Sequence, residues 1–204
     1  MILFILLLLF VIIVIYFVFR SDSADNDAQR KEYGDRGEQI TGNILVGSLP
    51  RGYTVIRNLE VTYDGKTSEI DYVVVGKTGV FIIEVKSMKG TIVGDCSDYN
   101  WIQCKTDQYG NDFEKQFYNP VKQVGTHVYR LANYLRDNNV HTYVNSAVYF
   151  SEPRAKYRIT GVTEKCPVFT HRTTNDMIDY IMHATEDLSE STVEKIIALL
   201  TEDE

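Results

Sequence analysis

The stretch SEIDYVVVGKTGVFIIEVK, residues 68–86, decides the fold of this chain. Two runs rich in β-branched and aromatic residues flank a Gly-Lys-Thr-Gly turn signal, so we expect two adjacent strands. Side chains alternate across a strand, which places Glu84 and Lys86 on one face, and a hairpin brings Asp71 beside them. Charges buried among apolar residues are costly unless they bind something. Two carboxylates suit Mg²⁺, with Mn²⁺ as a substitute.

The alternative without a function is a solvated strand face or a structural ion cluster, because charged residues often alternate on exposed strands. However, the run at residues 80–83 is continuously apolar, which is typical of a strand buried on both faces. Asp71 likewise leads directly into three valines. This context favours a metal-dependent site.

Five short motifs occur in a fixed order between residues 30 and 135. They read GDRGE (34–38), GKTSEID (65–71), GVFIIEVKSMKG (79–90), WIQ (101–103) and NPVKQ (119–123). In this order they resemble the nuclease-related domain (NERD) family of the PD-(D/E)xK nuclease superfamily. Two departures flank Asp71: Glu69 stands where a Gln is common, and Tyr72 stands where a His is common. Neither replaces Asp71, so they bear on substrate preference and rate rather than on metal binding.

The resemblance implies a role for each residue of the candidate site. Asp71 and Glu84 are expected to bind the metal directly, together with the backbone carbonyl of Val85. Lys86 is expected either to orient and deprotonate the attacking water or to neutralise the phosphate.

Two further residues are expected at the rim of the site. The resemblance implies that Glu38, on the first helix, is an outer acidic residue or holds a second metal ion. It also implies that Gln123 positions water or the scissile phosphate. We expect Asn119 to cap the helix that begins at Pro120, and His127 to be structural or exposed.

The N-terminal residues 2–19 contain no charged residue, Gly or Pro. As a helix they would be roughly 27 Å long, close to the ~30 Å hydrocarbon core of a bilayer. A secretory signal peptide is the alternative, but a basic n-region is missing, the apolar run is too long and no good Ala-x-Ala site follows. We therefore expect an uncleaved transmembrane anchor over residues 1–19 and a polar tether over residues 20–29.

Basic residues follow the anchor and none precedes it, which places the C-terminal domain in the cytoplasm of a single-pass membrane protein. Cysteine usage agrees, because three cysteines without paired spacing suit a reducing compartment (Cys96, Cys104 and Cys166).

Residues 30–204 suit one domain of about 175 residues. Sequence patterns predict helices over 31–49, 119–138, 174–184 and 189–200, and strands over 53–63, 90–93, 101–104, 143–150 and 167–169 besides the two above. The order helix, three strands, helix, strand predicts an α/β fold with a mixed central sheet flanked by helices. The resemblance supplies the restriction-endonuclease-like core, over about 30–150, with a C-terminal helical extension over about 170–204.

Together these features predict a membrane-anchored, Mg²⁺-dependent nuclease that hydrolyses phosphodiester bonds in DNA. The alternative is a catalytically weak or inactive nuclease-fold module that serves binding or assembly at the membrane. The net charge of −7 favours the alternative, because it repels nucleic acid at long range. The intact set of Asp71, Glu84 and Lys86 favours the enzyme. No cysteine and histidine set has zinc spacing, and no P-loop motif is present.

Overall fold

The computed structural model describes residues 31–107 and 109–202. The chain divides after Arg36, and the residues from Gly37 onward form the body described below. Residues 31–48 are helical. The elements that follow are β1 (Thr54–Tyr63), β2 (Lys66–Gly76), β3 (Gly79–Lys86), β4 (Thr91–Asp95), β5 (Asn100–Thr106), β6 (Asp112–Tyr118), α2 (Pro120–Asp137), β7 (Val144–Phe150), β8 (Lys156–Thr160), β9 (Val168–Thr170), the short 3₁₀ helix η1 (His171–Thr173), α3 (Thr174–Met182) and α4 (Glu190–Thr201).

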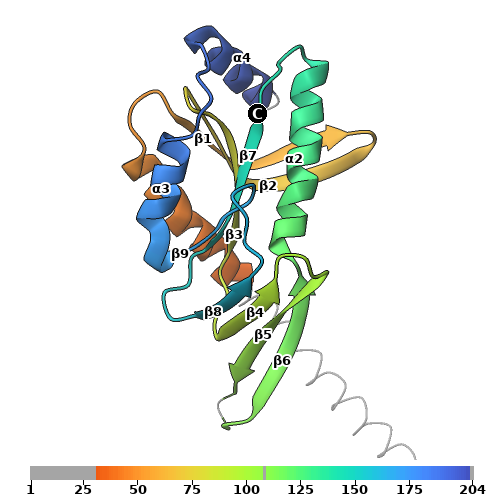
Figure 1. Cartoon of the computed structure of the whole chain (residues 1–204), viewed down its shortest axis with the longest axis vertical. Coiled ribbons are helices and arrows are strands. Elements are labelled where there is room, and N and C mark those ends of the chain that lie inside the picture. The colour runs from red at the N-terminus through yellow and green to blue at the C-terminus, as the bar shows by residue number, and fades with distance from the viewer. Residues whose placement is uncertain (1–30, 108, 203–204) are drawn as a thin grey trace, which may run out of the picture. The chain divides into compact units, whose positions relative to one another are not determined.

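The strands form two sheets (Figure 1). A five-stranded sheet has the order β1-β2-β3-β7-β9, in which β1, β2 and β3 are antiparallel and β7 and β9 run parallel to β3. A four-stranded sheet has the order β6-β5-β4-β8, with β8 parallel to β4. The predicted α/β fold with a mixed sheet is thus confirmed. The prediction of one central sheet was wrong, because the short strands β4 and β5 pair with β6 and β8 in a second sheet.

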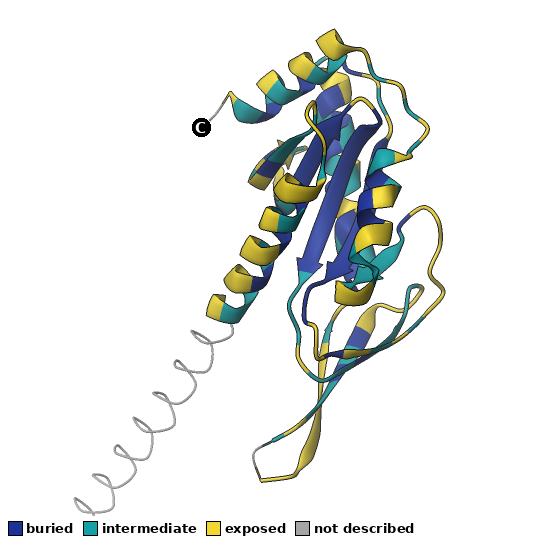
Figure 2. Cartoon of the chain, turned by 90° about the vertical axis from the view of Figure 1, so that its left-hand side faces the viewer, coloured by how far each residue is buried: buried dark blue, intermediate teal, exposed yellow. Residues whose placement is uncertain are grey.

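The hydrophobic core lies on both faces of the five-stranded sheet. On one face α2 and α4 pack against the sheet through residues such as Leu131 and Ile196. On the other face the first helix and α3 contribute Leu45 and Met177. Figure 2 shows the central strands buried and the β5–β6 hairpin largely exposed. The apolar run of β3 was therefore a correct sign of a strand covered on both faces.

Strands β1 and β2 bend together beside the candidate site. Ile70 packs on the α2 side of the sheet and Tyr72 on the opposite side, although residues two apart on a regular strand share a face. Opposite this bend, Asn58 of β1 has φ of 52°, a left-handed conformation that asparagine tolerates better than most residues. The regular pairing of β2 with β3 ends at Tyr72 and Ile83, which frees the backbone of β3 beyond it to pair with the Asp71 side chain.

Within residues 31–107 and 109–202, no helix is both long enough and apolar enough to cross a membrane. The predicted anchor at residues 1–19 and the tether at residues 20–29 lie outside the described residues, so both stay predictions.

Candidate functional site

Glu84 and Lys86 lie at the C-terminal end of β3, on the face covered by α2. The Glu84 side chain is buried, with 1% of its surface exposed. Lys86 Nζ donates hydrogen bonds to Glu84 Oε1 at 2.7 Å and to Gln123 Oε1 of α2 at 3.1 Å. The lysine is thus held between a strand carboxylate and a helix amide, and it shares a face of β3 with Glu84, as alternation along the strand predicted.

Asp71 reaches the same end of β3 from β2. Its Oδ2 accepts a hydrogen bond from the backbone N–H of Val85 at 2.7 Å, where the regular β2–β3 ladder has ended. Burial raises the pKa of Asp71 from 3.8 to about 7, and the neighbouring charge of Glu84 acts in the same direction. The Val85 hydrogen bond and the Lys86 charge oppose this shift without cancelling it. Two carboxyl groups are therefore crowded into one partly buried place, where their mutual repulsion favours a protonated Asp71.

Glu84 behaves differently from Asp71. Burial acts to raise the pKa of Glu84, but the adjacent His127 ring and the Lys86 ammonium outweigh it, so the net shift is downward. His127 Nε2 lies 3.4 Å from Glu84 Oε2, a contact too poorly aligned to count as a hydrogen bond. Glu84 Oε2 and both ring nitrogens of His127 consequently have no hydrogen-bond partner among the described residues. Buried polar atoms without partners are uncommon in native proteins and call for an explanation.

The first helix approaches the site closely because it carries two glycines on the side facing the sheet. A Cβ atom added to Gly37 would lie 2.4 Å from Ser87 Cβ and 2.8 Å from Ser151 Oγ, just beyond the ends of β3 and β7. A Cβ atom at Gly42 would lie 2.5 Å from the Tyr72 hydroxyl. This contact brings Glu38 to the edge of the site.

Glu38 lies at the rim of the site, as predicted, but on the opposite side of the sheet from α2. The Tyr72 hydroxyl donates to the backbone carbonyl of Glu38 at 2.8 Å, which fixes the helix at this position. The Glu38 carboxylate lies 3.6 Å from an Arg57 nitrogen. It contributes to the upward pKa shift of Asp71 only as the weakest of the causes.

The N-terminus of α2 is held against the second sheet. Asn119 Oδ1 accepts a hydrogen bond from Val121 N–H at 2.9 Å, which confirms it as the helix cap. Its Nδ2 donates to the carbonyls of Asp98 and Cys96 at 2.8 and 3.1 Å, both in the β4–β5 loop. Asn119 therefore fixes the position of the α2 turn that carries Gln123.

His127 contacts Glu84, which the sequence did not indicate. The sequence favoured a structural or exposed residue, and the side chain is buried against Glu84, which excludes the exposed alternative. A signal existed, because His127 follows Gln123 by one helical turn and so lies on the same edge of α2. This spacing points to a contact with Glu84 only when α2 is known to cover the face of β3 that carries Glu84.

The donor set can be tested for its fit to a metal ion. Within residues 31–107 and 109–202, no group of three or more His, Cys, Asp and Glu side chains is arranged to hold one. Mg²⁺ does not require such a group, because it commonly uses one or two carboxylates and completes its shell with water and substrate phosphates. Glu84 Oε2 has no hydrogen bond among the described residues and only the His127 ring nearby, and a divalent cation would both bind this oxygen and relieve the repulsion between Asp71 and Glu84. The residues present therefore fit Mg²⁺ or Mn²⁺.

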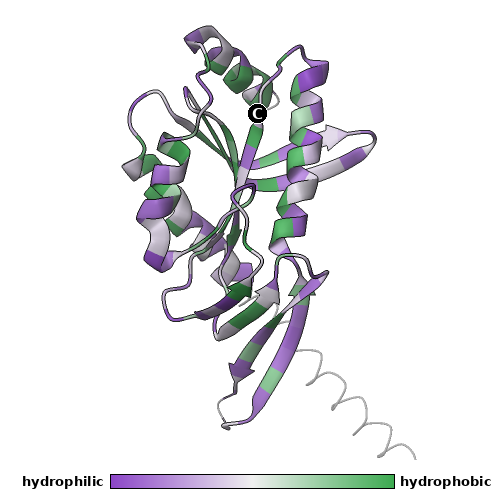
Figure 3. Ribbon diagram, in the orientation of Figure 1, coloured by the Kyte–Doolittle hydropathy of each residue, from purple (hydrophilic) through white to green (hydrophobic). Residues whose placement is uncertain are grey.

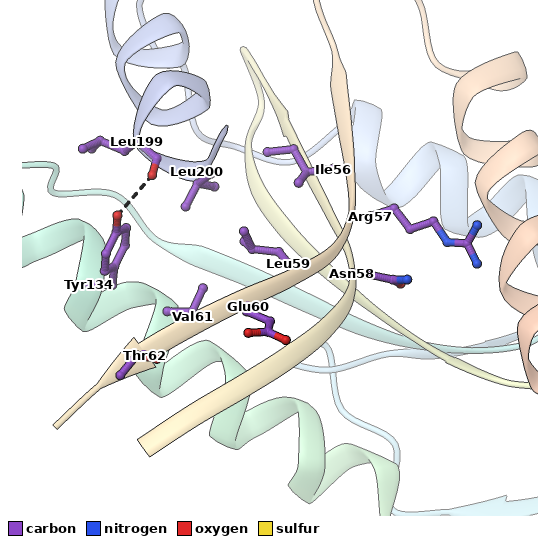
Figure 4. Close-up of a pocket in the computed structure, with 10 residues that line it drawn as sticks. All are labelled: Ile56, Arg57, Asn58, Leu59, Glu60, Val61, Thr62, Tyr134, Leu199 and Leu200. Carbon is purple, nitrogen blue, oxygen red and sulfur yellow. Dashed lines mark hydrogen bonds between the residues drawn. The ribbon is translucent and has the colours of Figure 1, made fainter. Parts of the chain in front are cut away.

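A separate pocket of about 460 Å³ lies between β1 and the helices α2 and α4 (Figure 4). The Tyr134 hydroxyl donates to the carbonyl of Leu199 at 3.1 Å along one side of it. Glu60 is the one acidic residue in its lining, and Arg57 points out of it toward Glu38. This pocket lacks the paired carboxylates and is not the candidate site.

Comparisons with known proteins identify the family to which the chain belongs. The chain is 33% identical over 88 residues to an uncharacterized protein of Bacillus anthracis, and this match covers 41% of the chain and 42% of that protein. The chain thus spans less than half the length of this relative. No solved structure matches the chain. Residues 33–151, which contain all the candidate site residues, match the family described as nuclease-related domain (NERD). This match covers more than half of the 204 residues, and the chain therefore belongs to the NERD family.

Proposed function

We propose that this protein is a metal-dependent nuclease that hydrolyses phosphodiester bonds, with DNA as its substrate. The observation that carries the proposal is the nearly fully buried Glu84, paired with Lys86 and crowded by Asp71 at the end of β3. Burying a carboxylate costs several kcal/mol in real proteins, which the pairing with Lys86 offsets only in part, and fold stability alone does not call for a second acid beside it. A site for a cation and a phosphate accounts for both acids and for the lysine.

In this proposal Asp71, Glu84 and the carbonyl of Val85 hold Mg²⁺ or Mn²⁺. When bound, the ion supplies Lewis-acid activation of water and neutralises charge that develops on the phosphate. Asp71 must be ionised to act as a ligand, and its pKa of about 7 means that metal binding competes with protonation near neutral pH.

Lys86 has a separate task because its ammonium is a donor and not a metal ligand. Glu84 and Gln123 hold Nζ by two hydrogen bonds, which leaves its third proton available to a phosphate oxygen or a water. Gln123 keeps its own amide nitrogen for water or phosphate. Glu38, farther out and paired with Arg57, tunes the charge of the site from its rim.

The protein is also proposed to work at the membrane. Its uncharged residues 2–19 would anchor it as a single-pass protein, and the basic residues after them would keep the nuclease-related domain in the cytoplasm. Fusion of a reporter to Glu204 tests this orientation. A reporter that is active only outside the cytoplasm should stay silent, and its activity would reverse the orientation.

The second candidate function is a binding or assembly module that keeps the fold without turnover. The net charge of −7 favours it, because nucleic-acid affinity depends mainly on neutralisation of phosphates by Lys and Arg. Lys86 also donates a hydrogen bond to one of the two oxygens of Glu84. If a metal ion cannot bind this carboxylate while Lys86 holds it, the site has no metal and no activity.

The deciding experiment is a digestion assay on the full chain in detergent. Labelled single-stranded DNA, duplex DNA and RNA are incubated with Mg²⁺, Mn²⁺ or a chelator. The nuclease proposal predicts cleavage with Mg²⁺ or Mn²⁺, none with the chelator, and none by an Asp71→Asn variant purified in parallel. Absence of cleavage on every substrate and metal would favour the binding module.

A further inference from the structure

His127 is a buried histidine of α2 to which the proposed nuclease function gives no task. Its side chain is 9% exposed, and both of its ring nitrogens lack a hydrogen-bond partner among the described residues. An unpaired buried polar group costs free energy, so a residue that served packing alone would be apolar. Val124 and Leu131, about one turn before and one turn after His127, are apolar and fully buried. The histidine between them therefore calls for a reason other than packing.

Within residues 31–107 and 109–202, the one ion-pair contact of His127 is with Glu84. Nε2 lies 3.4 Å from Glu84 Oε2, and this oxygen is likewise without a hydrogen bond. An ionised carboxylate can only accept hydrogen bonds, so the pair is completed when Nε2 carries a proton and donates it. The contact is poorly aligned in the metal-free chain, but hydrogen bonds in active sites are often long without the ligand and tighten when it binds.

Glu84 Oε2 can accept this hydrogen bond and still bind a cation, because each carboxylate oxygen has two lone pairs. Lys86 Nζ already donates to the other oxygen, Oε1, at 2.7 Å. With His127 on Oε2, the protein holds both oxygens of Glu84. The carboxylate can then no longer rotate about its last bond.

Helix α2 supports both sides of this arrangement. Gln123, one turn before His127, accepts a hydrogen bond from Lys86 Nζ at 3.1 Å. The same edge of the helix thus reaches Oε1 through the lysine and Oε2 through the histidine. Just after His127, Arg130 ties α2 to β2 by donating to the buried hydroxyl of Ser68. Residues on a rigid element hold a functional geometry more precisely than residues on a loop.

Two other roles for His127 agree less well with the structure. Direct binding of the ion is one, but no group of three His, Cys, Asp and Glu side chains in the described part of the chain is arranged to hold an ion. His127 therefore does not converge with Asp71 and Glu84 on one point, and Mg²⁺ prefers oxygen ligands. A general base is the other, but a base must reach the proton that it removes, and this ring is nearly enclosed.

We propose that His127 is a positioning residue, which donates a hydrogen bond from Nε2 to Glu84 Oε2 and holds this carboxylate in the orientation that binds the cation. The inference rests on the cation site of the proposed nuclease function and deepens it by one residue. Hydrogen-bond partners of a ligating carboxylate typically contribute about 10–100-fold to metal affinity.

The first test measures the Mn²⁺ affinity of the full chain in detergent by electron paramagnetic resonance, without nucleic acid. His127→Leu removes the donor at nearly constant volume and should weaken Mn²⁺ binding by about 10–100-fold. His127→Gln keeps a side-chain N–H donor and should retain most of the affinity. The matched control is His141→Leu, which changes an exposed histidine between α2 and β7 and should bind like the wild type.

Chemical denaturation of the same variants in chelator separates positioning from a structural role. A merely structural histidine would give lower stability in both His127 variants and an unchanged Mn²⁺ affinity in the folded chain, which would overturn the proposal. Equal losses of affinity in His127→Leu and His127→Gln would also overturn it. Pulsed measurements on bound Mn²⁺ add a third outcome of this kind: a directly bound nitrogen that disappears in His127→Leu would make His127 a ligand.

A second measurement needs no metal ion. Long-range proton–nitrogen NMR of the chain with ¹⁵N-labelled histidine shows which ring nitrogen carries the proton, and the loss of one signal set in His127→Gln assigns it. The His127 ring should be protonated at Nε2 in the metal-free wild type. Protonation at Nδ1 alone would overturn the proposal.

The positioning role and the nuclease function fail separately. A wild type whose Mn²⁺ affinity depends on His127 but that never cleaves keeps the positioning role and loses the nuclease function. A wild type that cleaves with Mg²⁺, while His127→Leu binds Mn²⁺ as tightly as the wild type, keeps the function and loses the positioning role. Absence of Mn²⁺ binding by the wild type would overturn the positioning role whatever the cleavage assay shows.

Discussion

Strands β3 and β6 differ sharply in how they place charged residues. Every residue of β3 is buried except Lys86, which is half-buried, whereas every residue of β6 is exposed except Phe117. Figure 3 shows the same contrast, with β6 mostly hydrophilic and the central strands hydrophobic. A carboxylate in a buried strand costs free energy, so Glu84 calls for an explanation, which the proposed cation site supplies. Charged residues on the exposed strand β6 cost little free energy, so their presence alone does not indicate a function.

The largest expected effect comes from the buried acids. Asp71→Asn or Glu84→Gln should lower cleavage by about 100-fold or more, because each change removes a negative charge needed to bind the cation while preserving shape. The measurement is the cleavage rate against Mg²⁺ concentration. Glu60→Gln is the matched control, since this exposed acid of β1 lies outside the site, and it should cleave like the wild type. Wild-type rates in both site variants would remove these acids from the mechanism.

The next effect separates the lysine from the ligands. Lys86→Ala should lower turnover by about 100-fold, the usual contribution of a positioned proton donor or acceptor, with little change in the Mg²⁺ concentration that gives half-maximal rate. The reason is that Nζ bonds Glu84 and Gln123 and is not itself a ligand. A large shift in the Mg²⁺ dependence with unchanged turnover at saturation would show instead that Lys86 only organises Glu84.

A third prediction concerns stability without metal. Below pH 3.8 Asp71 is protonated in both the folded and the unfolded chain and has no effect. As the pH rises toward 7, the unfolded chain loses the proton while the folded chain keeps it, so the raised pKa lowers stability until the penalty is complete above about pH 7. Asp71→Asn should therefore stabilise the chain by about 2–4 kcal/mol at pH 8 and hardly at all at pH 4.

Denaturation at several pH values in chelator measures this difference. Asp71→Ala is the control, because it also removes the charge but leaves the Val85 N–H without its acceptor, and its gain should be smaller. A gain for Asp71→Asn that is independent of pH would contradict the assignment of the shifted pKa to Asp71.

The smallest effect tests the contact between the first helix and the sheet. Gly37→Ala should destabilise the chain by about 1–3 kcal/mol, since its Cβ would collide with Ser87 and Ser151. Gly47→Ala on the same helix meets nothing within 4 Å and should stabilise the chain by about 0.5–1 kcal/mol. Chemical denaturation of both variants gives the comparison. Equal effects would mean that the helix does not pack tightly at Gly37.

The sequence predicted the buried parts of the fold well, for a physical reason. β3 and α2 carry apolar patterns that only burial explains, and both lie close to the predicted residues. β6 and β8 were missed because their polar and aromatic side chains alternate without an apolar face strong enough to set a period. Such strands form through pairing with neighbours, which a single stretch of sequence does not reveal.

The candidate site divides in the same way. Alternation along one strand predicted that Glu84 and Lys86 share a face. The predicted hairpin placed Asp71 beside them. The bend at Asn58, the Val85 N–H bonded to Asp71 and the burial of His127 depend on how β1, β2 and α2 pack on β3. Local sequence patterns do not predict how elements distant in sequence pack against one another.

The most direct test of the central claim is a titration of the full chain in detergent with Mn²⁺, followed by electron paramagnetic resonance. If Asp71 and Glu84 form one cation site, the wild type should bind Mn²⁺, Mg²⁺ should displace it, and binding should weaken as the pH falls below about 7. Asp71→Asn and Glu84→Gln should each abolish this binding, while Glu60→Gln should retain it. Mn²⁺ binding that survives both site changes, or a wild type that binds none, would contradict the account.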